Sequence, residues 1–299
     1  ACHSAKRVDE RLKFFFVSLG RRAPLPGGTT AMGDTGGLPA VFAERGRQLV
    51  FDSGAHTYSV NGKPVLASVT GLLDTLWHTD TQALAARCGP GARRRATGDE
   101  WATDEEVMAA WAKNRDAAAA RGNAIHASLH AAVCGLAQCP PEAPRPPPGA
   151  DEADGQWTQW LWDFVNGGDR AATLALPEMP LWGTVLDGSN VVAGTPDLLV
   201  CRGTGVDAKW SIVDWKSVVP ELIVLDRGTV ETVTGQSVRG TKQVLYSVQL
   251  ALYCAILRRH YGIDIPPERR FIVSVVPGET PQVVPLAPDS DALAQIVAA

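Results

Sequence analysis

Two short apolar stretches, each interrupted by an aspartate, constrain the fold of this chain more than any other feature. Residues Val191–Val200 and Ser211–Ser217 are expected to form buried β-strands, because both are short, rich in β-branched residues and bounded by turn-forming residues. Asp197 lies in the first stretch and Asp214 in the second. An unpartnered carboxylate is costly in an apolar strand, and two on neighbouring strands repel each other. A divalent cation between the strands would remove both costs, so the pattern predicts a metal site.

The lysine that follows the second aspartate adds a positive charge at the same place. Side chains alternate between the two faces of a strand, so Asp214 and Lys216 leave one face and Trp215 leaves the other. Lys216 is therefore expected to stand beside the metal. On this motif alone, two solvated charges at strand ends and an unrelated lysine explain the pattern equally well.

The composition is that of a soluble globular protein. The chain has 299 residues, of which 45% are hydrophobic and 20% are charged. Its formal net charge of −4 gives no overall basic field for a nucleic-acid partner, although a protein can concentrate positive charge in one groove. Three short basic clusters are present, and each taken singly fits a solvated surface: Arg93-Arg94-Arg95, Arg258-Arg259 and Arg269-Arg270.

The cysteines and the apolar runs limit the cellular setting. The six cysteines are scattered, and Cys134 and Cys139 are not followed by a second pair at zinc-finger spacing. Free thiols in a reducing compartment are therefore expected. No apolar run is long enough to span a membrane. These features predict a soluble protein inside a cell, and an infected cell, a nucleus or a mitochondrion is compatible with them.

Glycine and proline divide the chain. Residues 1–42 are rich in Gly, Pro, Thr and Ala and predict a flexible N-terminal extension. The folded domain is then expected to cover residues 43–299, with a proline-rich loop at 139–149. Asn61-Gly62 predicts a hairpin with a type I′ turn. Helices are expected in segments 81–121, 116–136 and 244–261, and late strands in segments 271–276 and 282–284.

Further polar residues stand out in apolar or helical segments. Gln249 and Tyr253 lie one turn apart on an expected helix. His126 lies in an Ala-rich helical segment, and Glu178 follows a proline in an extended segment. Each has an ordinary explanation on its own: a shared helix face, a hydrogen-bonded structural histidine, or an exposed acid at a strand end.

Taken together and in this order, these residues resemble the PD-(D/E)XK nuclease superfamily. Pro196-Asp197 followed by Asp214-Trp215-Lys216 resembles the motif that names it. Gln249 and Tyr253 resemble the Gln-x-x-x-Tyr motif of its RecB-like branch, and Gly122 before His126 resembles the helix that carries a metal-binding histidine there. The segment Ala67–Leu73, after a Tyr-containing hairpin, is similar to the start of phage and large-virus exonucleases and of mitochondrial genome maintenance exonucleases. The resemblance covers residues 48–285.

The resemblance implies a fold and an activity. The fold is α/β and restriction-endonuclease-like, with a central mixed β-sheet flanked by α-helices. The activity is metal-dependent hydrolysis of phosphodiester bonds in DNA, most often by an exonuclease in DNA replication, recombination or repair. The partner is DNA, as single strands or duplex ends, and a helicase or recombinase can accompany such enzymes. Segments 81–136 and 220–242, the first with Arg93-Arg94-Arg95, are expected to cover the site of an end-dependent enzyme and to hold backbone phosphates.

The resemblance also assigns roles to residues. Asp197 and Asp214 would hold one or two Mg²⁺ or Mn²⁺ ions, for which carboxylate oxygens are suitable ligands. His126 and the backbone carbonyl of Trp215 would complete the metal shell. Lys216 would orient or deprotonate the attacking water and offset the charge that develops on the phosphate. The remaining roles are a second-metal ligand and two residues that orient the site or contact the strand being cut: Glu178, Gln249 and Tyr253.

Three alternatives remain open at this point. The chain could be a non-catalytic DNA-binding module on a decayed nuclease fold, a structure-specific endonuclease, or another metal-dependent hydrolase that does not need Gln249 and Tyr253. An iron–sulfur cluster is not expected, because only Cys254 lies in the region where the iron–sulfur members of the branch carry a cysteine cluster.

Overall fold

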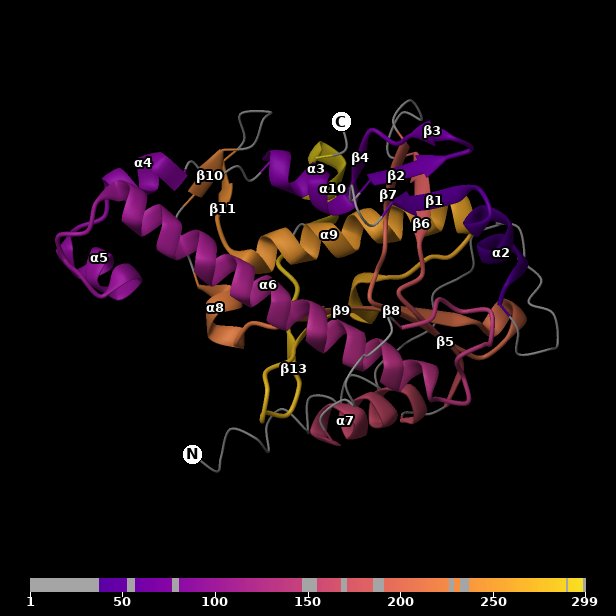
Figure 1. Ribbon diagram of the computed structural model, residues 1–299. Coiled ribbons are helices and arrows are strands. Elements are labelled where there is room, and N and C mark those ends of the chain that lie inside the picture. Colours follow the sequence, from indigo (N-terminus) through magenta and orange to yellow (C-terminus); the bar gives the residue numbers. More distant parts are fainter. Residues whose placement is uncertain are drawn as a thin grey trace.

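The computed structural model of the protein describes most of the chain after its first 37 residues. The described residues are 38–52, 57–76, 81–146, 155–167, 171–184, 191–225, 229–231, 237–288 and 290–297. Most of the expected N-terminal extension therefore lies outside the described residues. The described part has a mixed α/β fold built from several sheets and helices (Figure 1).

The largest sheet has five strands in the order β13-β12-β9-β8-β5. Strands β8 and β9 are neighbours and antiparallel, whereas β9 and β12 run parallel, so the sheet is mixed. This agrees with the expected central mixed sheet and with the expected adjacency of the two acid-bearing stretches. The strands are β5 (Ala172–Pro177), β8 (Leu198–Arg202), β9 (Lys209–Lys216), β12 (Arg270–Ser274) and β13 (Gln282–Val284).

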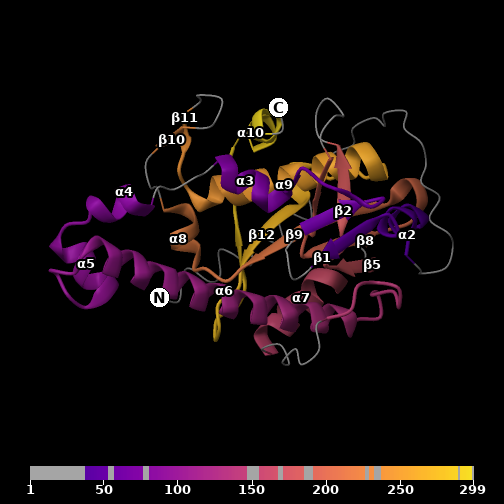
Figure 2. The ribbon, with the colours of Figure 1, turned by 45° about the horizontal axis from the view of Figure 1, so that its top comes forward.

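Helices cover both faces of this sheet (Figures 1 and 2). Helix α9 (Lys242–Ile256) lies on one face, and helices α6 (Asp104–Cys134) and α7 (Gly155–Asn166) lie on the other. Each face of the sheet has its own hydrophobic core. Side chains alternate between the faces along β9, so Ile212 packs with α9 while Val213 and Trp215 pack with α6 and α7. Asp214 lies between Val213 and Trp215 in sequence and therefore faces α9, as the alternation predicts.

Two small sheets lie beside the large one. The first joins β4 (Ala67–Ser68), β7 (Val191–Gly194) and β6 (Leu181–Thr184). The second joins β1 (Leu49–Asp52), β2 (Thr57–Val60) and β3 (Lys63–Pro64). Between β2 and β3, Asn61 and Gly62 both have positive φ angles, 50° and 75°, which confirms the predicted type I′ turn. A separate pair is formed by β10 (Thr229–Glu231) and β11 (Ser237–Arg239).

The stretch Val191–Val200 is not one strand, and that expectation is wrong. It divides into β7 and β8, which belong to different sheets, with Thr195, Pro196 and Asp197 between them. Pro196 has no backbone N–H to donate to a ladder, so a strand does not continue through it. Asp197 consequently lies in the break, immediately before β8.

The N-terminal boundary of the folded part also differs from expectation. Helix α2 (Ala40–Gly46) begins before the predicted start of the domain at residue 43. Phe42 is fully buried in the core against Trp210 and Tyr261, so it cannot belong to a flexible extension. An isolated phenylalanine after a glycine-rich tract carries no helical periodicity, and the burial is created by partners far along the chain.

The expected helical segment 81–121 divides into two short helices and the start of a long one. The remaining helices are α3 (Val69–Leu76), α4 (Thr81–Ala86), α5 (Pro90–Thr97), α8 (Pro220–Val224) and α10 (Ser290–Val297), and α9 continues into a π-helical turn, Leu257–Tyr261. Ser68 Oγ accepts from the Gly71 N–H and caps α3. The long helix is α6, which has 31 residues and begins at a capping box formed by Thr103 and Glu106. No helix in the described part of the chain is both long and apolar enough to cross a lipid bilayer.

Candidate metal centre

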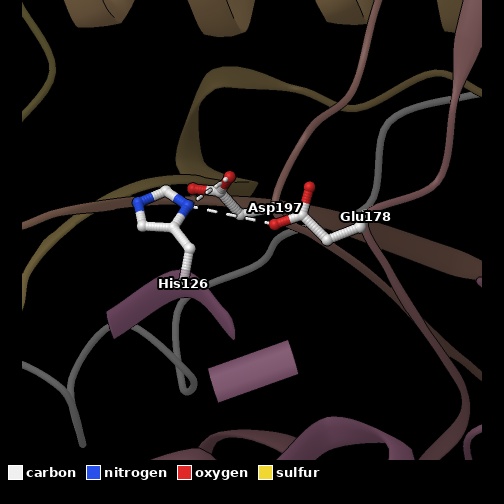
Figure 3. A group of neighbouring side chains, drawn as sticks. All are labelled: His126, Glu178 and Asp197. Carbon is white, nitrogen blue, oxygen red and sulfur yellow. Dashed lines mark ion pairs between the residues drawn. The ribbon is translucent and has the colours of Figure 1, made fainter. Parts of the chain in front are cut away.

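Three side chains from distant parts of the sequence converge at one end of the large sheet. His126 comes from α6, Glu178 follows β5, and Asp197 precedes β8 (Figure 3). His126 Nδ1 lies 3.2 Å from Asp197 Oδ1 and 3.9 Å from Glu178 Oε1. One nitrogen or oxygen from each of the three lies within 4.8 Å of the others, the arrangement needed to share one cation. The side chains of His126 and Glu178 are 30% and 28% exposed, so the group is open to solvent on one side.

Backbone hydrogen bonds aim the two carboxylates at each other. The Trp215 N–H donates to Asp197 Oδ2 at 2.5 Å, which fixes the aspartate from the neighbouring strand. The Glu178 N–H donates to the Asp197 carbonyl at 3.0 Å. Glu178 has φ of +44°, a left-handed conformation that is unfavourable for a residue with a Cβ atom. This turn after β5 directs the glutamate toward Asp197.

Helix α6 reaches the site because a glycine lies one turn before the histidine. A Cβ atom on Gly122 would lie 3.2 Å from Ser217 Oγ, just after the end of β9. A larger residue would therefore require Ser217 or α6 itself to shift. The glycine that the sequence analysis associated with His126 thus lies in a close contact between α6 and the end of β9.

Asp214 and Lys216 form a second group beside the first. Both leave the same face of β9, and Lys216 Nζ lies 2.7 Å from Asp214 Oδ2. Asp214 Oδ2 is buried and has no hydrogen bond of good geometry among the described residues, despite this ion pair. A buried carboxylate oxygen with spare acceptor capacity next to three candidate ligands fits a hard divalent cation.

Helix α9 places a row of side chains against this second group. Gln249 Oε1 accepts from Lys216 Nζ at 3.3 Å, and the Tyr246 ring lies under the same ammonium with its centroid 4.5 Å from Nζ. Tyr253 is buried and donates from its hydroxyl to the Thr195 carbonyl at 3.3 Å. These three α9 residues are spaced by three and four positions, so they share one face of the helix.

A glycine in β7 makes room for Tyr253. A Cβ atom on Gly194 would lie 2.8 Å from Tyr253 Cε1, closer than side chains pack. The ring therefore occupies space that only a glycine leaves open at this position. The contact of Tyr253 with Thr195, two residues before Asp197, thus depends on a second close approach, that of helix α9 to β7.

Two tyrosines at the site were missed by the sequence analysis. Tyr58 in β2 lies with its hydroxyl 3.2 Å from Thr195 Oγ1, so it touches the break that carries Asp197. Tyr246 contacts Lys216 as described above. The spacing of Tyr246 from Gln249 could have suggested it, and the sequence analysis noted the tyrosine of the hairpin without assigning Tyr58 to the site.

The charges of the first group are strongly coupled. Burial acts to lower the pKa of His126, but Asp197 and then Glu178 outweigh it and raise this pKa to about 10. Burial raises the pKa of Glu178 to about 7. Burial also opposes ionisation of Asp197, but His126, Lys216 and the Trp215 N–H hold its pKa below the usual value.

The second group shows the same competition between burial and charge. Burial raises the pKa of Asp214 to about 6, although Lys216 acts in the other direction. Burial acts to lower the pKa of Lys216, but Asp214 and Asp197 outweigh it and raise this pKa. The two groups together therefore retain protons that the same residues would lose in water, and a metal cation would displace such protons.

The structure thus brings into two adjoining groups the side chains to which the resemblance assigned metal-binding, catalytic or orienting roles. His126, Glu178 and Asp197 form one group, while Asp214 pairs with Lys216 and Gln249 instead of joining the triad. The indole of Trp215 packs on the far face of the sheet, against Trp160. The roles assigned to these residues, including the Trp215 carbonyl as a ligand, stay predictions.

The arginines expected to hold phosphates are engaged elsewhere. Arg93 donates to the carbonyls of Ala85, Cys88 and Ala102 and pairs with Asp104 at 2.5 Å. Arg94 pairs with Glu100. These contacts hold α4 and α5 to the start of α6, so a structural role accounts for two of the three arginines in that cluster.

No protein-family model matches the chain, and no functionally characterised protein matches it either.

Proposed function

We propose that this chain is a divalent-metal-dependent nuclease of the PD-(D/E)XK type that hydrolyses phosphodiester bonds in DNA. The observation that carries the proposal is the convergence of His126, Glu178 and Asp197 beside the buried Asp214–Lys216 pair. This combines oxygen and nitrogen donors for one or two cations with a fixed ammonium. Mg²⁺ and Mn²⁺ suit the carboxylates, and the imidazole favours Mn²⁺ somewhat.

The proposed reaction assigns each group a task. A bound divalent cation supplies Lewis acidity and lowers the pKa of a bound water. Asp197, aimed by the Trp215 N–H, Asp214 and His126 would hold the cation, and Glu178 would hold a second one directly or through water. Lys216 offsets the negative charge that grows on the phosphate, and Gln249 keeps its ammonium in place.

The topology supports the proposal of a restriction-endonuclease-like fold. The acid-bearing break and the Asp-x-Lys strand are carried by adjacent strands of a mixed sheet covered by helices on both faces. The helix with Gln249 and Tyr253 follows in sequence and packs on the face from which Asp214 leaves. We extend the proposal to an exonuclease because these features together resemble the RecB-like branch, where end-dependent enzymes are frequent.

The test uses labelled linear DNA and covalently closed circles of the same sequence. With Mg²⁺ or Mn²⁺ the protein should degrade linear DNA, and chelator should stop the reaction. Asp197→Asn should abolish cleavage, because it removes one negative charge from the cation site. Asp207→Asn is the matched control, because this exposed aspartate lies on the 3₁₀ turn between β8 and β9. The Asp207→Asn protein should cleave DNA at the normal rate.

The outcomes separate the alternatives. Nicking of circles at the rate of linear DNA would replace the exonuclease by an endonuclease. Binding of DNA without cleavage in either metal would indicate a non-catalytic module. Equal activity of Asp197→Asn and the protein without substitutions would refute the site.

A further inference from the structure

Two thiols lie next to each other where helix α6 ends. Cys134 is the last residue of α6, and Cys139 lies in the bend that follows. Cys139 Sγ donates to Cys134 Sγ, and the two sulfur atoms are 3.8 Å apart. Both thiols are free and partly exposed, whereas those of Cys201 and Cys254 are buried. Small molecules in solution can therefore reach the pair.

Hydrogen bonds hold the chain in place around the two cysteines. The Pro144 carbonyl accepts from Cys134 Sγ at 3.6 Å and lies 2.9 Å from His130 Nε2. The Gln138 carbonyl accepts from the Ala175 N–H of β5 at 2.9 Å. The segment after α6 is thus bonded both to that helix and to an edge strand of the large sheet. The fold itself keeps the two thiols together.

Neighbouring cysteines can hold a metal or react with each other, and the surroundings favour the second. A structural zinc site uses four nitrogen or sulfur ligands. Among the described residues, the group of three side chains placed to share a cation is the triad of the metal centre, which contains neither cysteine. The described part of the chain therefore offers the cysteine pair no third ligand placed in this way.

The two thiols are not equivalent. Burial and then the neighbouring Cys134 raise the pKa of Cys139 to about 12. The thiolate is the reacting form of a cysteine, so Cys139 is a poor first nucleophile. Its S–H instead donates to Cys134 Sγ, which is the geometry for stabilising negative charge on that sulfur. The arrangement suits a first attack by Cys134 and a second by Cys139.

We infer that Cys134 and Cys139 are a site of reversible oxidation to an intramolecular disulfide, with a low-molecular-weight disulfide as the oxidant. The Cys134 thiolate attacks one sulfur of the small disulfide and expels one small thiolate. Cys139 then loses its proton and attacks Cys134 Sγ, which closes the protein disulfide and expels the second small thiolate. Two electrons pass from the protein to the small disulfide, which becomes two small thiols. A small dithiol reverses the reaction.

The bond would fasten together the supports of two residues of the triad. Helix α6 carries His126, and β5, which is bonded to Gln138, leads to Glu178. A cross-link also lowers the conformational entropy of the unfolded chain, although a loop as short as 134–139 gives a modest effect. The oxidised protein should therefore have a Tm about 2–8 °C above that of the reduced protein.

The test incubates the full chain with oxidised and reduced glutathione at a series of ratios and at mildly alkaline pH. Remaining thiols are alkylated, and tryptic peptides are identified by mass spectrometry. Peptide 122–170 contains Cys134 and Cys139 and no other cysteine. It should escape alkylation and become lighter by two hydrogen atoms at ratios where Cys88, the other partly exposed thiol of the described residues, is still alkylated. The second step is intramolecular, so the pair should oxidise before a single thiol does.

Two variants check the order of the steps. Cys139→Ser should stop at the mixed disulfide, so that Cys134 carries one glutathione and the Tm does not rise. Cys88→Ser is the matched control, which should form the same disulfide and show the same rise in Tm as the unsubstituted protein.

Three results would overturn the inference. They are a peptide 122–170 that stays doubly alkylated at every ratio, one that carries glutathione on both cysteines, and a disulfide that joins two protein chains. An intramolecular disulfide that leaves the Tm unchanged would overturn the proposed fastening of α6 to β5. None of these measurements involves DNA or a metal, so the result is independent of the proposed nuclease activity.

Discussion

At the scale of the residue, Lys216 is held by three neighbours of different chemistry. Its ammonium is 2.7 Å from a carboxylate oxygen of Asp214, 3.3 Å from the amide oxygen of Gln249, and over the ring of Tyr246. A cation over a tyrosine ring is attracted to the negative face of the π-system. Tyr246 therefore limits where Lys216 can point.

Tyr246 should thus be a positioning residue for the proposed nuclease. Tyr246→Leu should lower kcat by about 2- to 30-fold with little change in KM, which corresponds to loss of a cation–π contact of about 0.5–2 kcal/mol. Tyr246→Phe keeps the ring and should restore most of the rate. The measurement is steady-state cleavage of linear DNA. Equal rates for the leucine and phenylalanine variants would contradict this role.

At the scale of the element, the sequence correctly predicted features that depend on local pattern, such as turns and strand faces. It did not predict features that depend on distant partners, such as which strands pair. The type I′ turn at Asn61-Gly62 and the faces of Asp214 and Trp215 follow from local geometry, and the structure agrees with both. The division of residues 191–200 between two sheets depends on which strands pair on either side of Pro196. Periodicity reports burial but not which sheet a strand joins.

The candidate site shows the same limit. The selected side chains could be found because acids, a lysine and a histidine stand out in apolar segments. Their division into the triad and the Asp214–Lys216 pair could not be predicted. It depends on the turn at Glu178 and on how closely α6 approaches β9. The place of Tyr58 at the site could not be predicted for a related reason, since its contact with Thr195 joins residues 137 positions apart.

The close approach of α6 gives a prediction at this scale. Gly122→Val should move the helix outward and weaken Mn²⁺ binding by about 10- to 100-fold, the effect typical of disturbing residues that orient a metal ligand. No ligand is removed, so the fold should persist. Ala120→Val introduces the same side chain at an exposed position on the same helix; it costs some helix propensity, which Gly122→Val does not, and should still bind normally. Titration calorimetry with Mn²⁺ measures both, and equal affinities would show that the contact with Ser217 does not position His126.

At the scale of the whole molecule, the site couples protons, metal and stability. Three groups have folded pKa values above their ordinary values: His126 at about 10, Glu178 at about 7 and Asp214 at about 6. For each of them the folded state binds the proton more tightly than the unfolded chain. The free energy of unfolding contributed by these groups therefore falls as the pH rises through each folded value. Asp197 has the opposite sign, but its contribution changes only below the ordinary aspartate pKa.

A bound cation should reverse this dependence, because it replaces the protons. Without metal, the contribution of the site to stability should decrease between about pH 5 and about pH 9, whereas metal affinity should increase as the ligands lose protons. The rise in Tm produced by Mn²⁺, measured against chelator in the same buffer, should therefore grow steadily with pH over the lower part of that range. Asp197→Asn should show little rise at any pH. A rise that is independent of pH, or one that is equally large in Asp197→Asn, would mean that Mn²⁺ binds elsewhere on the protein.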